Sequence, residues 1–104
     1  MILELAELTI APGMETEFEE GVAEAAPLFL RAKGCHSLSI HRVVETPNIY
    51  RLFVQWETID NPMVDFRNSP DFQRWRELVS HCFAAPPVVT HSRVRYSTSD
   101  TTSL

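Results

Sequence analysis

The chain has too little of several features to belong to some large functional classes. Only 3 of its 104 residues are glycines and 2 are cysteines, and neither type falls in a phosphate-loop, metal-binding or redox spacing. Acidic residues outnumber basic ones 14 to 9, whereas a nucleic-acid partner needs a basic patch. No apolar run reaches the roughly 18 residues of a membrane span. We therefore expect a small domain without a nucleic-acid or membrane partner.

The composition is that of an ordinary globular domain, with 44% hydrophobic and 22% charged residues. The first residues, MILELAEL, lack the basic start and apolar centre of a signal peptide. Cys35 and Cys82 are far apart in the chain, so we interpret them as reduced thiols. These features predict a cytoplasmic protein with no metal ion and no cofactor.

Four segments carry apolar residues in the alternation that is typical of strands: 2–10, 35–45, 48–58 and 88–96. In the third of these, Tyr50, Leu52, Val54 and Trp56 share one face. In the first, the alternation changes phase between Leu5 and Leu8. That change predicts either a bulge or a strand that is buried on both faces.

Helix start and stop signals separate these strands. Residues 14–33 have apolar positions at helical spacing and an acidic first part, and Gly34 follows them. Asn61-Pro62 predicts the start of a short helix with Asn61 as its cap. The segment Ser69-Pro70-Asp71 predicts a stronger start of the same kind. The helix that it opens carries an apolar stripe of Phe72, Trp75, Val79, Cys82 and Phe83.

The resulting order is β–α–β–β–α–β, which is typical of ferredoxin-like α+β domains. It predicts a four-stranded antiparallel sheet with both helices on one face. Residues 1–96 form this single domain, and we expect the polar segment 97–104 to be a loose tail. The other sheet face also carries apolar residues such as Phe53, so we expect two copies to pair as a homodimer.

Several short motifs along the chain together resemble the antibiotic biosynthesis monooxygenase family. They are Pro12-Gly13 before an acidic helix with Phe18, Ala32-Lys33-Gly34, Trp56-Glu57-Thr58, Phe66-Arg67-x-Ser69, Phe72-x-x-Trp75 and Phe83-Ala-Ala-Pro-Pro87. Each motif is weak alone, but their order and spacing match over about residues 3–96. The resemblance implies a dimeric α+β barrel with an apolar cavity between the sheet and the helices of each subunit.

The resemblance does not imply a single activity, because members of this family differ in what they do. Some members of this family oxidise fused-ring aromatic compounds with O₂ and without metal or flavin, some degrade haem, and others have no established reaction. Where the haem-degrading relatives have an asparagine, a tryptophan and a histidine, this chain has Ala6, Phe66 and Arg76. Haem degradation is therefore not expected. Many relatives also have a histidine where this chain has Pro62.

All but one of the candidate site residues come from the second helical region; Trp56 lies near the end of the third strand. We predict that Arg67 and His81 are catalytic, since Arg67 could stabilise a phenolate or a superoxide-like anion and His81 lies beside the aromatic stripe. The residues predicted to bind a planar substrate are Trp56, Phe66, Phe72, Trp75 and Phe83. The alternative is that these aromatics are plain core, that Arg67 forms a salt bridge, and that His81 is a surface residue.

The leading hypothesis is a cofactor-independent monooxygenase that acts on an aromatic or quinonoid small molecule. In such a reaction the protein only orients the ring, excludes water and stabilises an anion, so no catalytic motif is required. The alternatives are a non-catalytic dimeric module that binds an apolar aromatic molecule, and an isomerase-type enzyme on the same barrel.

Overall fold

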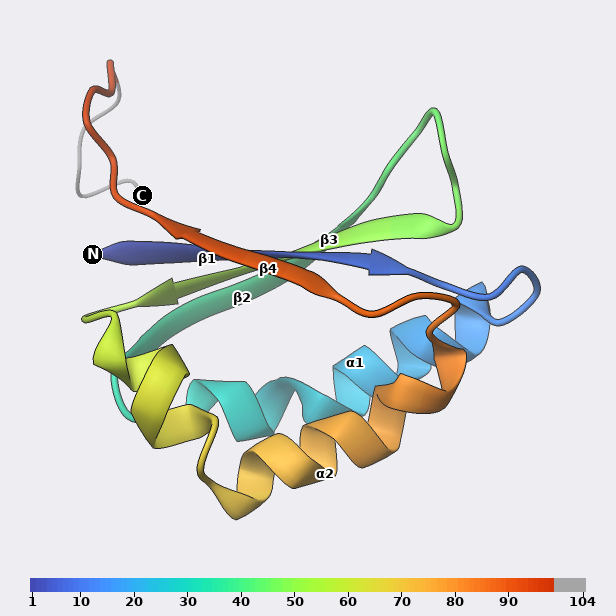
Figure 1. The fold of residues 1–104 in the computed structure, drawn as a ribbon, viewed down its shortest axis with the longest axis horizontal. Coiled ribbons are helices and arrows are strands. Elements are labelled where there is room, and N and C mark those ends of the chain that lie inside the picture. Colours follow the sequence, from blue (N-terminus) through green and yellow to red (C-terminus); the bar gives the residue numbers. More distant parts are fainter. Residues whose placement is uncertain (99–104) are drawn as a thin grey trace.

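The computed structural model of the protein describes residues 1–98. Its elements, in chain order, are β1 (Ile2–Thr9), α1 (Glu15–Leu30), β2 (Cys35–Arg42), β3 (Ile49–Trp56), the π-helical turn η1 (Asn61–Phe66), α2 (Pro70–Val79), the 3₁₀ turn η2 (Ser80–Cys82) and β4 (Val88–Ser92). Both long helices cover the same face of the sheet (Figure 1). The predicted β–α–β–β–α–β fold is confirmed.

Several boundaries differ from the sequence-based expectations. Helix α1 ends at Leu30 rather than at residue 33, and β2 ends at Arg42 rather than at residue 45. The last strand ends at Ser92 rather than at residue 96, and α2 ends at Val79, well before Pro86. Residues 99–104, most of the predicted tail, lie outside the described part of the chain. Within residues 1–98, no helix is both long and apolar enough to cross a membrane.

The sheet has the order β2-β3-β1-β4, and each neighbouring pair of strands is antiparallel. Strand β1 lies between β3 and β4, and its pairing with β3 runs without a register shift from Ile2 to Thr9. The phase change between Leu5 and Leu8 is therefore not a bulge. Leu8 is buried against the helices, whereas Leu5 lies on the opposite face beside Phe53.

The hydrophobic core lies between the sheet and the two helices. The predicted stripe of β3, from Tyr50 to Trp56, is buried throughout on alternate residues. Phe18 and Phe29 of α1 are almost completely buried against it. Trp75 and Val79 complete the core from α2. This arrangement puts the inner face of the sheet and the aromatic side of α2 opposite each other.

The two predicted helix caps have different outcomes. Ser69 caps α2, because its hydroxyl oxygen accepts the Phe72 N–H at 3.2 Å. The prediction that Asn61 caps η1 is wrong. The buried Asn61 amide lies inside the turn, where Oδ1 accepts the Thr58 N–H at 2.9 Å and Nδ2 donates to Asp65 at 3.2 Å. The amide thus fixes the loop that leads from β3 towards the cavity wall.

Gly34→Ala is expected to destabilise this loop. Gly34 has φ +79°, and an added Cβ would lie 2.0 Å from Asn61 Oδ1. A left-handed alanine costs about 1–2 kcal/mol, and losing a buried hydrogen bond costs about 1–3 kcal/mol. We expect the free energy of unfolding in urea to fall by about 2–4 kcal/mol.

Gly13→Ala is the matched control for Gly34→Ala. Gly13 has φ +93° with no atom within 4 Å of an added Cβ, so only the conformational cost of about 1–2 kcal/mol applies. Equal losses in the two variants would show that the contact between Gly34 and Asn61 is unimportant.

Candidate active site

A cavity of about 130 Å³ lies between the inner face of the sheet and the helices. Side chains of β1, β3 and β4 line one side of it, and residues of α1, η1 and α2 line the other. Its aromatic wall consists of Phe29, Phe66, Phe72, Trp75 and Phe83. Most of its surface is apolar, as is typical of sites for small organic molecules.

The structure brings most of the predicted site residues to this cavity. Arg67 lines it, as do four of the five predicted substrate-binding aromatics. Trp56 is not among the lining residues. It is fully buried, and its Nε1–H donates to Glu4 Oε1 at 2.9 Å. Trp56 therefore contacts the cavity only indirectly, by holding the Glu4 carboxyl with this hydrogen bond.

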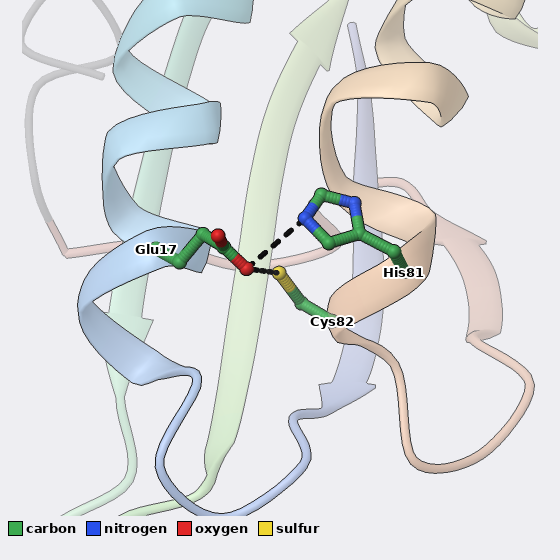
Figure 2. Close-up of side chains that lie close together, drawn as sticks. All are labelled: Glu17, His81 and Cys82. Carbon is green, nitrogen blue, oxygen red and sulfur yellow. Dashed lines mark hydrogen bonds and ion pairs between the residues drawn. The ribbon is translucent and has the colours of Figure 1, made fainter.

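His81 lies outside the cavity lining. Helix α2 ends at Val79, and His81 lies in the following turn η2, where its side chain meets Glu17 of α1. Its side chain is 51% exposed, and its Nε2 lies 3.1 Å from Glu17 Oε2 on α1 (Figure 2). Catalysis by His81 stays a prediction, and the structure places no part of the cavity beside it.

The aromatic residues belong both to the cavity wall and to the hydrophobic core. Phe29 and Trp75 meet edge to face with their ring centroids 5.0 Å apart, and Phe66 lies 4.8 Å from Phe29. Phe72 extends this cluster from Phe66 at 5.7 Å. Trp75 is only 8% exposed although it borders the cavity. The cluster therefore stabilises the domain and also presents flat apolar surfaces to a ligand.

The polar end of the cavity is a pair of residues that sequence reasoning missed. Glu4 of β1 and His91 of β4 are cross-strand partners and both line the cavity. Their side chains are 14% and 16% exposed, and His91 Nε2 lies 3.7 Å from Glu4 Oε1. Within the described residues, this buried Nε2 has no hydrogen-bond partner. A buried polar atom without a partner is well placed to bind a polar group of a ligand.

Burial raises the pKa of the Glu4 carboxyl above its usual value. The indole N–H of Trp56 and the charges of His91 and Arg67 act in the opposite direction but do not cancel the effect of burial. An ionisable pair with a perturbed pKa in an apolar cavity is typical of acid–base sites. Glu4, His91 and Arg67 can thus exchange a proton with a ligand and stabilise an anion.

Glu4 is expected to make the folded protein less stable as the pH rises. Its folded-state pKa is raised from 4.5, so the folded chain holds its proton to higher pH than the unfolded chain does. The protonated Glu4 carboxyl contributes its full stabilisation below the pKa of the unfolded chain. That stabilisation is lost as the pH rises through the raised pKa of the folded chain. Glu4→Gln keeps an oxygen for the Trp56 N–H and removes this loss.

Urea denaturation over a range of pH measures the effect. The Glu4→Gln variant should gain stability relative to the wild type as the pH rises through that window. A stability difference that stays constant with pH would contradict a raised pKa.

A signal for Glu4 was present in the sequence. The alternating set Ile2, Glu4, Ala6, Leu8 and Ile10 has one charged residue on an otherwise apolar face. His91 had no such signal, because Val88 and Val89 leave both faces of the last strand apolar. Only the register of β1 with β4 brings the two side chains together.

The positions that the resemblance relates to haem also face the cavity. Ala6, Phe66 and Arg76 all line it, and so does Pro62. None of these four side chains supplies an iron ligand, since the arginine stays protonated. Glu17, His81 and Cys82 do form a group of metal-ligand types, but they lie outside the lining of the cavity (Figure 2).

The fold is that of a ferredoxin-like α+β domain with a cavity between its sheet and its helices. The sequence model of the family described as "Antibiotic biosynthesis monooxygenase" matches residues 1–78. The chain belongs to this family.

Two individual relatives are similar to this chain over most of their length. The chain is 35% identical over 91 residues to "Uncharacterized protein YczJ" of Bacillus subtilis (strain 168), covering 88% of this chain and 96% of that protein. A crystal structure described as "Putative antibiotic biosynthesis monooxygenase" from Bordetella bronchiseptica is 55% identical, with a TM-score of 0.90 over 91% of this chain and 97% of that one.

A more distant structure shares the fold. SnoaB from Streptomyces nogalater, described as a cofactor-independent oxygenase, is 18% identical, with a TM-score of 0.82 over 95% of this chain and 97% of that chain. At this identity the likeness concerns the fold alone.

Proposed function

We propose that this protein is a cofactor-independent monooxygenase that acts on an electron-rich aromatic or quinonoid small molecule. The observation that carries the proposal is the buried Glu4–His91 pair at one end of an aromatic cavity. Membership of the monooxygenase family supports it, and so does the fold shared with SnoaB. The chemistry requires a proton acceptor, an apolar site and a positive charge, and the cavity is lined by His91, by aromatic side chains and by Arg67.

His91 is the proton acceptor in this proposal. A phenolic hydroxyl in the cavity donates to the free Nε2 of His91, and the proton moves to the imidazole. The Glu4 carboxylate, 3.7 Å away, stabilises the imidazolium that forms. Arg67 stabilises the substrate anion, and the surrounding rings keep water away from it.

The remaining steps need only the substrate anion and O₂. The anion passes one electron to O₂, and the resulting radical and superoxide combine to form a carbon–oxygen bond. The peroxide is then protonated, and the carbon that carries it loses its second hydrogen as a proton. The O–O bond breaks as the C=O bond forms at that carbon. An anthrone thereby becomes a quinone: one oxygen atom enters the ring, and the other leaves as water with the two hydrogens of the methylene group.

Aerobic incubation with anthrones and hydroquinones, with O₂ uptake followed by electrode, tests the proposal. We expect uptake above the uncatalysed background for at least one planar substrate. If the protein binds such compounds without consuming O₂, the non-catalytic binding module is the better description. If it converts a compound to an isomer without O₂, the isomerase alternative replaces the monooxygenase.

We also propose that the protein is a homodimer that pairs through the outer face of the sheet. Leu5 and Phe53 are cross-strand neighbours on that face and are only partly covered within one chain. Light scattering at micromolar concentration should give twice the 11.9 kDa chain mass. Phe53→Arg should shift the mass towards that of one chain, and a stable wild-type monomer would contradict the proposal.

A further inference from the structure

Three side chains of metal-ligand type converge between α1 and η2. Glu17 lies in the first turn of α1, whereas His81 and Cys82 are consecutive in η2 (Figure 2). Glu17 Oε2 lies 3.1 Å from His81 Nε2 and 3.8 Å from Cys82 Sγ. One ligand atom from each residue lies within 4.8 Å of the others.

We propose that Glu17, His81 and Cys82 form a binding site for a divalent late transition-metal ion such as Zn²⁺. Zinc–ligand bonds of about 2.0–2.3 Å at tetrahedral angles put the nitrogen and oxygen about 3.3 Å apart and the oxygen and sulfur about 3.5 Å apart. The nitrogen–oxygen and oxygen–sulfur separations in the structure lie close to these values, and the nitrogen and sulfur lie within 4.8 Å of each other. Sequence spacing could not indicate this site, because Glu17 lies far from the other two residues in the chain.

The charges of the three ligands also suit a divalent cation. The Glu17 carboxylate and the Cys82 thiolate together neutralise two positive charges, and a neutral His81 adds none. Because only the thiolate form of Cys82 binds metal, binding would release the thiol proton to solvent. Nitrogen and sulfur ligands favour zinc-like ions over Mg²⁺ and Ca²⁺, which prefer oxygen.

The surface position of the site leaves room for an ion to enter. Glu17 and His81 are 57% and 51% exposed, whereas Cys82 is buried beneath them. Water can therefore supply a fourth ligand. A bound ion would tie the start of α1 to η2, directly before Phe83 of the cavity wall.

The chain contains a matched control for this arrangement. Cys35 and His36 are also consecutive, and His36 Nε2 is paired with Glu57. Cys35 Sγ lies instead 3.9 Å from the Ser37 carbonyl oxygen, so the thiol does not join that pair. The same three residue types therefore occur there without converging.

Titration with Zn²⁺ in a calorimeter tests the proposal on the full chain. We expect one ion per chain, and an affinity that falls by roughly tenfold or more in His81→Ala and in Glu17→Gln but not in His36→Ala. All three changes are at exposed positions, so folding should be retained. With Co²⁺ as the probe, a thiolate-to-metal charge-transfer band should be present in the wild type and absent in Cys82→Ala.

Either of two results would overturn the metal site. One is no saturable uptake of Zn²⁺ by the wild type. The other is equal binding by His81→Ala and His36→Ala. Neither result depends on O₂ chemistry, so the outcome is separate from that of the proposed monooxygenase.

Discussion

His91→Ala should lower kcat for the oxidation of a phenolic substrate by about 10²–10⁴-fold. This is the range that a positioned general base contributes. Within residues 1–98, His91 Nε2 is a buried atom without a hydrogen-bond partner, and in the proposed reaction Glu4 beside it stabilises the protonated ring. The KM should change far less, since the aromatic wall that binds the substrate is untouched.

Two further variants make this experiment decisive. His36→Ala removes a surface imidazole that is also paired with a carboxylate, and it should leave kcat unchanged. Glu4→Gln keeps the contact with Trp56 but removes the charge, so kcat should fall as well. A large loss in His81→Ala with full activity in His91→Ala would restore the assignment that the sequence alone suggested.

Trp75→Ala should lower the free energy of unfolding by about 3 kcal/mol. Replacing a buried tryptophan by alanine costs about 3–5 kcal/mol, and Trp75 belongs at the lower end because one side of it already borders a cavity. The same change widens the cavity next to Phe29 and should raise the KM for a planar substrate. Chemical denaturation and steady-state kinetics measure the two effects separately.

Phe72→Ala is the matched comparison for Trp75→Ala. Phe72 lines the same cavity but is only partly buried, so its loss should cost about 1 kcal/mol while still weakening substrate binding. If the two variants lose equal stability, Trp75 is not the core residue that its burial indicates. If neither affects binding, the aromatic wall is not the substrate site.

Much of the fold was available from local patterns. The buried stripe of β3 and the Ser69 cap of α2 each follow from a few neighbouring residues, and both are confirmed. The part of the aromatic wall on α2 was predictable for the same reason, since Phe72 and Trp75 lie on one face of a single helix, whereas Phe29 of α1 was not predicted to line the cavity. Such features depend only on the period of a helix or strand.

The features that the sequence did not predict depend on contacts between separate helices and strands. The Glu4–His91 pair requires the register of β1 with β4, which no local pattern in the last strand determines. His81 was predicted to be catalytic because it lies beside the aromatic stripe in the sequence, but its side chain meets Glu17 of α1, which no local pattern indicates. Asn61 resembled a cap, yet its amide bonds backwards to Thr58.

Isotopic labelling of the product tests the central claim most directly. An anthrone is incubated with the protein under labelled O₂ in unlabelled water, and the quinone is analysed by mass spectrometry. The proposed monooxygenase reaction predicts one labelled oxygen atom per quinone, formed faster than in buffer and with the rate lost in His91→Ala. A quinone formed no faster than in buffer, or one whose new oxygen comes from water, would contradict it.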